Sequence, residues 1–178
     1  VAERLQEFDG SLGPEGLAVA LGVPEAATAW AFPDGAVDDS HTERIVVYNP
    51  GGERAEVEVR VLPTTDGSEP APQPFRLSIR AGTFAVVDYG AEDRVVPGVD
   101  HATVVRSTNG VPVVAERVTT HAGEPGAPDD DTDDEEGDGD GEDSAGGDIA
   151  VGPGAVVAAT RWAFPSSVDG DGLSLVVF

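Results

Sequence analysis

Two four-residue words occur twice each in this chain, and their spacing constrains the fold more than any other feature of the sequence. Val-Ala-Glu-Arg begins at Val1 and returns at Val114, a spacing of 113 residues. Trp-Ala-Phe-Pro begins at Trp30 and returns at Trp162, a spacing of 132 residues. This alternation predicts an internally repeated protein with a unit close to the ~100 residues of an immunoglobulin-like sandwich. A period of this length favours a string of domains over a solenoid of short repeats.

The two spacings differ by 19 residues, which predicts an insertion between Arg117 and Trp162. An acidic run of about that size, residues 128–148, lies in this interval. The order of the words predicts that the chain begins inside one unit and ends inside another. We therefore expect four parts: residues 1–4 as the end of a preceding repeat, 5–120 as a β-sandwich repeat unit, 121–148 as an acidic disordered linker or insertion, and 149–178 as the first strands of an incomplete next repeat. Whether those last strands pair back onto the first unit stays open.

The charge and composition of the chain exclude several classes of site. The formal net charge is −24, and 13 of the 34 acidic residues lie between Glu124 and Asp148. The remainder is still acidic, so its surface repels nucleic acid and anionic membranes. There is no cysteine, which rules out disulfides and thiolate metal sites. No apolar run reaches the ~18 residues of a membrane span, and no signal peptide is visible.

Apolar and polar residues alternate along several short segments, as in half-buried β-strands. The most regular is 55–61, and the segment before it, 45–48, is apolar on both faces. The turn residues Asn49 and Pro50 separate these segments, so we predict that they form a hairpin. Residues 28–32 predict a strand with Trp30 and Phe32 on one face, broken by the turn 33–35.

Two further hairpins are predicted. One joins 75–79 to 84–89, and the other joins 102–106 to 111–118 around Asn109 and Gly110. Residues 5–16 are polar and glycine-rich, which predicts a loop, and 17–21 predict a short strand or a single helical turn. Seven or eight short strands without a long helix predict an all-β, immunoglobulin-like antiparallel β-sandwich, followed by the start of a second repeat.

The repeated words resemble a family of uncharacterised β-sandwich repeats in exported or membrane-anchored proteins of actinobacteria and related bacteria. In that family a Trp-x-Phe-Pro strand precedes a strand that ends in Asn-Pro, and a Val-Ala-Glu-Arg strand comes later. Here the motifs supply the expected structural anchors of the sandwich, Trp30, Phe32, Asn49, Pro50, Glu116, Arg117 and, in the second copy, Trp162. The resemblance implies a modular protein outside the cell or on its surface, anchored through a segment elsewhere. It carries over no catalytic residues.

The acidic run raises the question of calcium. Calcium takes six to eight oxygen ligands, and an EF-hand loop requires glycine at its sixth position and glutamate at its twelfth. With Asp134 as the first position, Glu136, Asp138 and Gly139 fit, but the twelfth position is Ala145. The metal candidates are therefore weak: Asp134, Glu136, Asp138 and Asp140. We expect no cofactor, with diffuse cation attraction to a self-repelling linker and calcium as the lesser alternative.

The remaining candidate residues are interpreted as structural. A strand points Glu116 and Arg117 to opposite faces, and a partly buried glutamate needs a donor, so we expect a structural ion pair or hydrogen bond. Trp30 and Phe32 suit core anchors, with a carbohydrate-stacking platform as the alternative. The histidines His41, His101 and His121 each stand alone in a polar context, and no known catalytic motif occurs.

The sequence thus predicts a non-enzymatic, extracellular structural or adhesive module of a cell-envelope protein. Its expected partners are neighbouring repeats of the same chain, with a cell-wall polymer or a surface protein as further candidates. An accessory module that binds carbohydrate or peptide is the alternative, and a non-catalytic part of a cell-wall-active enzyme is a third. An exposed Trp30 ring would favour the binding module, and a buried ring favours the structural one.

Overall fold

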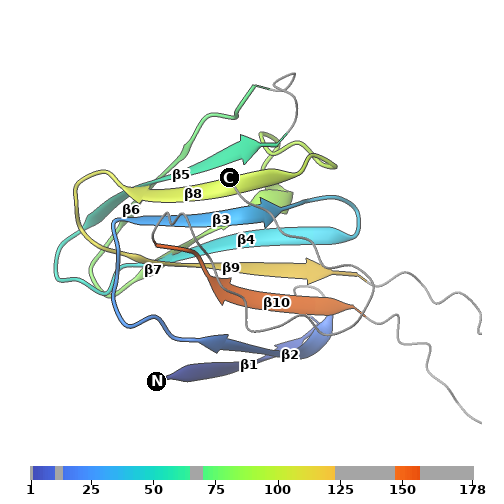
Figure 1. The fold of residues 1–178 in the computed structure, drawn as a ribbon, viewed down its shortest axis with the longest axis horizontal. Helices are drawn as coiled ribbons and strands as arrows, with labels where there is room; N and C mark the ends of the chain where they lie inside the picture. Colours follow the sequence, from blue (N-terminus) through green and yellow to red (C-terminus); the bar gives the residue numbers. More distant parts are fainter. Residues whose placement is uncertain (1, 11–13, 65–69, 123–146, 157–178) are drawn as a thin grey trace, which may run out of the picture.

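The computed structural model describes residues 2–10, 14–64, 70–122 and 147–156 (Figure 1). These residues form ten β-strands and one short 3-10 helix. The strands are β1 (Glu3–Asp9), β2 (Glu15–Leu21), β3 (Ala29–Gly35), β4 (His41–Tyr48), β5 (Ala55–Pro63), β6 (Phe75–Ile79), β7 (Phe84–Asp88), β8 (His101–Ser107), β9 (Val114–His121) and β10 (Asp148–Pro153), and the 3-10 helix is η1 (Tyr89–Ala91).

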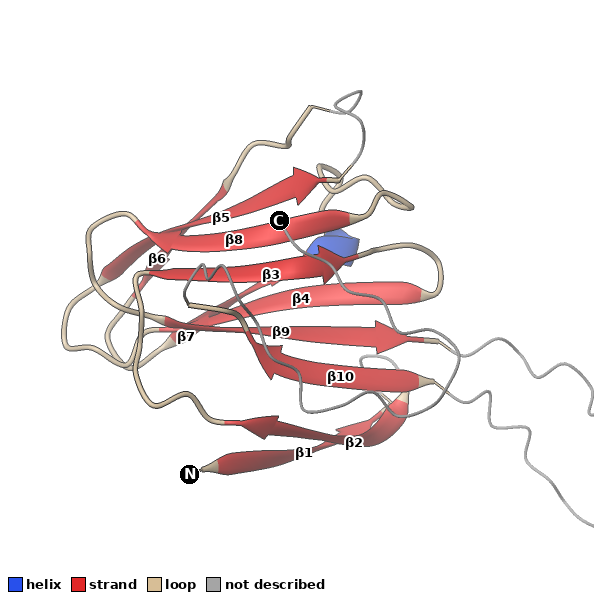
Figure 2. Ribbon diagram, in the orientation of Figure 1, coloured by secondary structure: helices blue, strands red, loops and turns tan. Residues whose placement is uncertain are grey.

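The strands form a β-sandwich with an additional two-stranded ribbon (Figure 2). One four-stranded sheet has the order β10-β9-β4-β7, and the other has the order β3-β8-β5-β6. The ribbon consists of β1 and β2. Every strand pairing is antiparallel. The prediction of an all-β antiparallel sandwich is confirmed. Within the described residues, no helix has the length and apolar character needed to cross a membrane.

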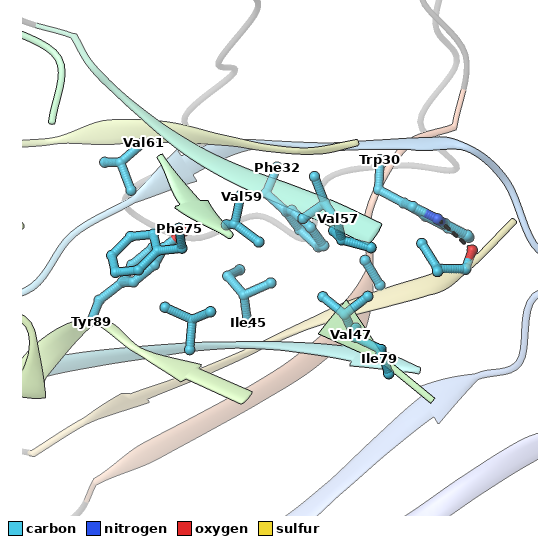
Figure 3. Close-up of a cluster of buried hydrophobic side chains, with 14 of the residues drawn as sticks. Trp30, Phe32, Ile45, Val47, Val57, Val59, Val61, Phe75, Ile79 and Tyr89 are labelled. Atoms are coloured by element: carbon cyan, nitrogen blue, oxygen red, sulfur yellow. Dashed lines mark hydrogen bonds between the residues drawn. The ribbon is translucent and has the colours of Figure 1, made fainter. Parts of the chain in front are cut away.

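The core lies between the two four-stranded sheets, where alternate residues of facing strands meet (Figure 3). Ile45 and Val47 of β4 are fully buried, as are Val57 and Val59 of β5. Such valine- and isoleucine-rich strands suit the interior, because β-branched side chains pack well on a pleated surface. Trp30 lies at one end of this layer and Phe75 and Tyr89 lie at the other, with Phe32 between them (Figure 3).

The predicted hairpin around Asn49 and Pro50 is wrong, because β4 and β5 lie in different sheets. The turn carries the chain across the sandwich, and the buried residues of the two strands face each other through the core. Asn49 is fully buried and holds this crossing, since its Nδ2 donates to the carbonyls of Glu53 at 2.7 Å and Ile79 at 3.0 Å. The residue identified as an anchor from the sequence is thus a structural one.

The other two predicted hairpins are wrong for the same reason. β6 pairs with β5 while β7 pairs with β4, and β8 pairs with β3 and β5 while β9 pairs with β4 and β10. The turns after β6 and β8 were located correctly, but they connect sheets rather than neighbours in one sheet. A local turn signal marks where the chain reverses and leaves open which strand becomes the partner.

Strand β3 continues through Pro33 to Gly35, beyond its predicted end. The pairing of β3 with β8 shifts register between Phe32 and Gly35, which is an irregularity of the β-bulge type. β3 forms the edge of its sheet, where a proline needs no partner for its missing N–H. The strand therefore continues through the proline, with a shift of register at this point.

The prediction of a loop over residues 5–16 is wrong. β1 and β2 pair along their full length, from Glu3 opposite Leu21 to Asp9 opposite Glu15. The predicted boundary between residues 4 and 5 consequently falls inside β1. Residues 17–21 are a strand, as one of the two sequence alternatives proposed.

A second ribbon, formed by β9 and β10, has the same register as the first. Residues of β1 and β9 correspond at the spacing of 113, and those of β2 and β10 at the spacing of 132, the two spacings of the repeated words. Under this correspondence the pair Glu3–Leu21 of the first ribbon matches the pair Glu116–Pro153 of the second. The first strand after the acidic run thus pairs back onto the first unit, which answers the question left open by the sequence.

The hydrogen bonds at the open end of each ribbon also correspond. The Gly22 amide donates to the Ala2 carbonyl at 2.8 Å, and the Gly154 amide donates to the Ala115 carbonyl at 3.4 Å. The connections differ, because the segment joining β9 to β10 is longer than the one joining β1 to β2. The 19-residue difference in spacing is therefore contained between β9 and β10.

Candidate functional site

The two Val-Ala-Glu-Arg words meet where the ribbons contact each other. Arg4 of β1 forms an ion pair with Glu116 of β9, and the side chains are 50% and 20% exposed. The prediction that Glu116 finds an arginine partner is confirmed, and that partner belongs to the other copy of the word. Glu116 and Arg117 point to opposite faces of β9, as the strand period requires. Figure 1 shows the β1–β2 ribbon lying beside β10.

The ribbon contact is built from small residues on one side and larger ones on the other. Ala18 and Ala20 of β2 are buried in it, at 6% and 7% exposure. A Cβ atom placed on Gly16 would lie 3.4 Å from the Cδ1 atom of Ile149 on β10. Small residues therefore let the two ribbons approach closely, and the isoleucine side chain fills the space that they leave.

The opposite face of the β1–β2 ribbon is apolar and exposed. Its apolar side chains are 60–66% exposed: Leu5, Leu17, Val19 and Leu21. They form a contiguous group, since Leu5 lies directly opposite Val19 and the neighbouring pairs contain Leu17 and Leu21. Four acidic residues share this face at alternate positions: Glu3, Glu7, Asp9 and Glu15. A clustered apolar surface with a polar rim is typical of an interaction site.

A second feature is a pair of ionisable side chains buried in the core. Glu43 of β4 and His101 of β8 are 0% and 2% exposed, and Glu43 Oε2 lies 3.5 Å from His101 Nε2. Within the described residues, neither Glu43 oxygen has a hydrogen-bond partner, and nor has His101 Nε2. The other ring nitrogen, Nδ1, lies 3.2 Å from the Val99 carbonyl. Charged groups persist in such an environment only when they are paired.

The surroundings of His101 shift its pKa. Burial alone would lower the pKa of His101, but contact with the Glu43 carboxylate outweighs burial, so the pKa of His101 lies above its ordinary value. Tyr89 packs edge-on against His101 at 5.5 Å between ring centroids. Its hydroxyl lies 3.0 Å from Thr103 Oγ1, and burial raises the pKa of the Tyr89 phenol. Contact with Glu43 thus favours the protonated form of His101.

Arg117 brings another charge to the same interior. Its guanidinium lies 5.7 Å from the centroid of the Phe32 ring, and its buried Nη1 has no hydrogen-bond partner within the described residues. Gly35 seals the cluster on the side of β3, since a Cβ there would lie 2.3 Å from Glu43 Oε2. Within the described residues, Glu43 and His101 are thus enclosed, at 0% and 2% exposure.

A small hollow lies beside His101. Its free volume is about 20 Å³, enough for one water molecule. Its lining residues are Val61, Pro63, Pro70, Pro72, Arg94, Val95, Val96, Val99 and His101.

Trp30 is a core anchor, in agreement with the favoured interpretation of the sequence. Its ring is 1% exposed, and Nε1 donates to the Val113 carbonyl at 2.8 Å (Figure 3). Phe32 is also buried. The alternative of a carbohydrate-stacking platform at these two residues is therefore wrong.

The histidines do not stand alone, contrary to the sequence interpretation. His41 and His121 are cross-strand neighbours, with 4.4 Å between their ring centroids. His41 Nδ1 lies 2.9 Å from Asp38 Oδ1, and this contact, together with bonds from Ser40, holds the pKa of Asp38 far below its usual range. Within the described ranges, no group of three or more His, Cys, Asp or Glu side chains is arranged to hold a metal ion.

Several sequence predictions fall outside the described residues. They concern Trp162 and the metal candidates Asp134, Glu136, Asp138 and Asp140. Conversely, the sequence interpretation missed Glu43 as a buried charge. Its signal was the two-residue period of β4, which places Glu43 on the same inward face as Ile45 and Val47. An acid at an inward position of an apolar strand indicates a buried partner, and only the fold identifies His101.

Comparison with solved structures gives several distant likenesses, including the two that follow. No protein-family description and no curated protein matches the chain. Anabaena sensory rhodopsin transducer is similar to 54% of this chain over 99% of its own length, with 23% identity and a TM-score of 0.45. A crystal structure of Thermotoga maritima 1070 is similar to 57% of this chain over 87% of its own length, with 19% identity and a TM-score of 0.49. Similarity at this level says nothing about what the chain does.

Proposed function

We propose that this chain is a non-catalytic structural module of a cell-envelope protein, in which β-ribbons join successive sandwich units outside the cell. The observation that carries the proposal is the contact between the two ribbons. They share a register, they place the two copies of one sequence word side by side, and Arg4 pairs with Glu116 across the contact. An element that recurs in sequence and packs on its own counterpart is suited to linking repeated units.

The interior of the sandwich agrees with a structural role. The buried Trp30 ring joins β3 to the segment before β9 through its hydrogen bond to the Val113 carbonyl. The ionisable pair Glu43–His101 is buried within the described residues, and Gly35 packs tightly against it. The extracellular placement rests on the resemblance of the repeated words to exported β-sandwich repeats.

The joint between the ribbons can be tested by the tumbling of their backbone amides, measured by nuclear magnetic relaxation on the 178-residue chain. We expect the amides of β1 and β2 to tumble together with those of β4 and β9. Arg4→Glu places a second carboxylate beside Glu116 and should loosen the ribbon by about 0.2–1 kcal/mol, the usual range for an exposed ion pair. The double variant Arg4→Glu/Glu116→Arg should restore the wild-type behaviour. A ribbon that moves independently in the wild-type chain would contradict the proposal.

The ligand-binding alternative can be tested in parallel. We expect a panel of soluble cell-wall glycans and short peptides at millimolar concentration to leave the melting temperature of the chain unchanged. A saturable rise in melting temperature with one of these compounds would contradict a purely structural role and support an accessory binding module.

A further inference from the structure

We propose that the exposed apolar face of the β1–β2 ribbon is a docking site for the small-residue face of another ribbon of the same repeat, carried by a neighbouring unit. This inference rests on the proposed function and names the partner of one surface. The large-residue face comprises Leu5, Leu17, Val19 and Leu21. The small-residue face is the opposite one, with Arg4, Gln6 and Phe8 on β1 and Gly16, Ala18 and Ala20 on β2.

In the β9–β10 ribbon, the corresponding face is already covered by another ribbon of the same chain. The counterparts of Leu5, Leu17 and Val19 are Val118, Ile149 and Val151. These three side chains are partly buried, whereas Leu5, Leu17 and Val19 are exposed. What covers the second ribbon is the small-residue face of the first, in which β2 lies against β10. The large-residue face therefore occurs twice, exposed in the first ribbon and covered in the second.

Shape complementarity follows from the same correspondence. In the observed contact Ile149 fills the space that Gly16 leaves open. Leu17 is the counterpart of Ile149, so it would fit against the equivalent glycine of an incoming ribbon. Large side chains that pack against small ones interdigitate without cavities, and this lets two β-ribbons stack closely.

Charge complementarity selects the incoming face. Glu3 is the counterpart of Glu116, which pairs with Arg4 in the observed contact. An incoming ribbon would thus place its own arginine beside Glu3. Two copies of the large-residue face cannot pair with each other as well, because each carries four acidic residues and like charges repel. The occupant is accordingly an arginine-bearing ribbon and not a second large-residue face.

The experiment uses a synthetic peptide of residues 1–24 as the probe, added to the isotope-labelled 178-residue chain. We expect saturable shifts of the methyl resonances of Leu5, Leu17, Val19 and Leu21, with a dissociation constant on the order of 1 mM because the peptide must order as it binds. Leu17→Glu in the chain should weaken binding at least tenfold. Leu62→Glu, at an exposed leucine on β5, is the matched control and should bind as the wild type does.

A charge exchange tests the predicted arginine contact. A peptide with Arg4→Glu should bind several-fold more weakly to the wild-type chain and regain affinity for the chain with Glu3→Arg. The inference is overturned if no saturable shift appears at 5 mM peptide, if Leu17→Glu binds as well as the wild type, or if the shifts occur at Val118 and Ile149 because the peptide displaces the chain's own ribbon. Failure here, with β1 and β2 still tumbling with the sandwich, would remove this inference and leave the proposed function standing.

Discussion

The β1–β2 ribbon and the β9–β10 ribbon share a register but are held by different means. In the second ribbon, β9 pairs with β4 along its whole length and is part of a sandwich sheet. The first ribbon is a separate two-stranded sheet that contacts the molecule through one face. A similar local structure is thus integrated in one place and appended in the other. The difference arises from the partner strands, because neither ribbon could be stable alone.

This contrast shows how a repeated element can serve two purposes. The second ribbon contributes buried residues to the core, such as Ala115 of β9. The first ribbon offers its apolar face to the outside, where a neighbouring unit could dock. We expect this attachment to be the weaker one, as suits a joint between units.

The largest expected effect comes from removing the Trp30 side chain, which holds the segment that leads into the second ribbon. Trp30→Ala removes a buried indole and its hydrogen bond to the Val113 carbonyl, just before β9. We expect the free energy of unfolding to fall by about 3–5 kcal/mol, as for other buried aromatic truncations. Phe84→Ala is the control, since Phe84 is 67% exposed, and should change stability by less than about 0.5 kcal/mol. Denaturant unfolding measures both, and similar losses would show that the anchor assignment is wrong.

A smaller loss is expected where the sandwich encloses its buried charges. A Cβ atom on Gly35 would lie 2.3 Å from Glu43 Oε2 and 2.9 Å from His101 Nε2. Gly35→Ala should therefore cost about 1–3 kcal/mol of stability through overpacking. Gly52→Ala is the matched control, because a Cβ there meets no atom within 4 Å. Thermal unfolding compares the two, and an unchanged Gly35→Ala variant would contradict the tight enclosure of Glu43.

The smallest expected effect is a pH dependence. It should act on the stability of the sandwich and not on the docking of the first ribbon. The pKa of His101 is raised in the folded protein, because Glu43 outweighs the effects of burial and of nearby Arg117. The pair therefore contributes stability that is fully present below the ordinary histidine pKa of about 6.5 and is lost as the pH rises through the raised value. Glu43→Gln should remove this dependence. The Arg4–Glu116 contact includes no histidine, so docking of the first ribbon should not follow this dependence.

A nuclear magnetic titration of the His101 ring checks this directly. The His101 ring of the Glu43→Gln variant, which lacks the neighbouring carboxylate, provides the reference. A His101 ring that titrates below the ordinary histidine value would contradict the assignment of Glu43 as its partner.

The sequence alone was sufficient for the class of fold and for most strands. Alternation in 55–61 and the apolar segment 45–48 identified β5 and β4, because the two-residue period records burial directly. The sequence did not predict which strands pair with each other. Local turn residues such as Asn49 report a change of direction, while the choice of sheet depends on contacts between residues far apart in the chain.

The candidate site was predictable only in part. The repeated words located the ribbons, and the spacing of Glu116 and Arg117 gave their opposite directions. The prediction of a loop at 5–16 failed because the strand signal of β1 is masked by acidic residues on the same face as Leu5. The proximity of His41 and His121, and of Glu43 and His101, depends on strand register, which no local pattern records.

Native-state hydrogen exchange tests the central claim most directly, since it measures an opening free energy for each amide of the two ribbons. We predict that amides of β9 paired with β4 exchange only through global unfolding. Amides that pair β1 with β2 should be protected but open at a lower free energy, and Arg4→Glu should lower that value further without changing β9. Equal opening free energies in both ribbons, or an unprotected first ribbon, would contradict an appended joint that docks on its own counterpart.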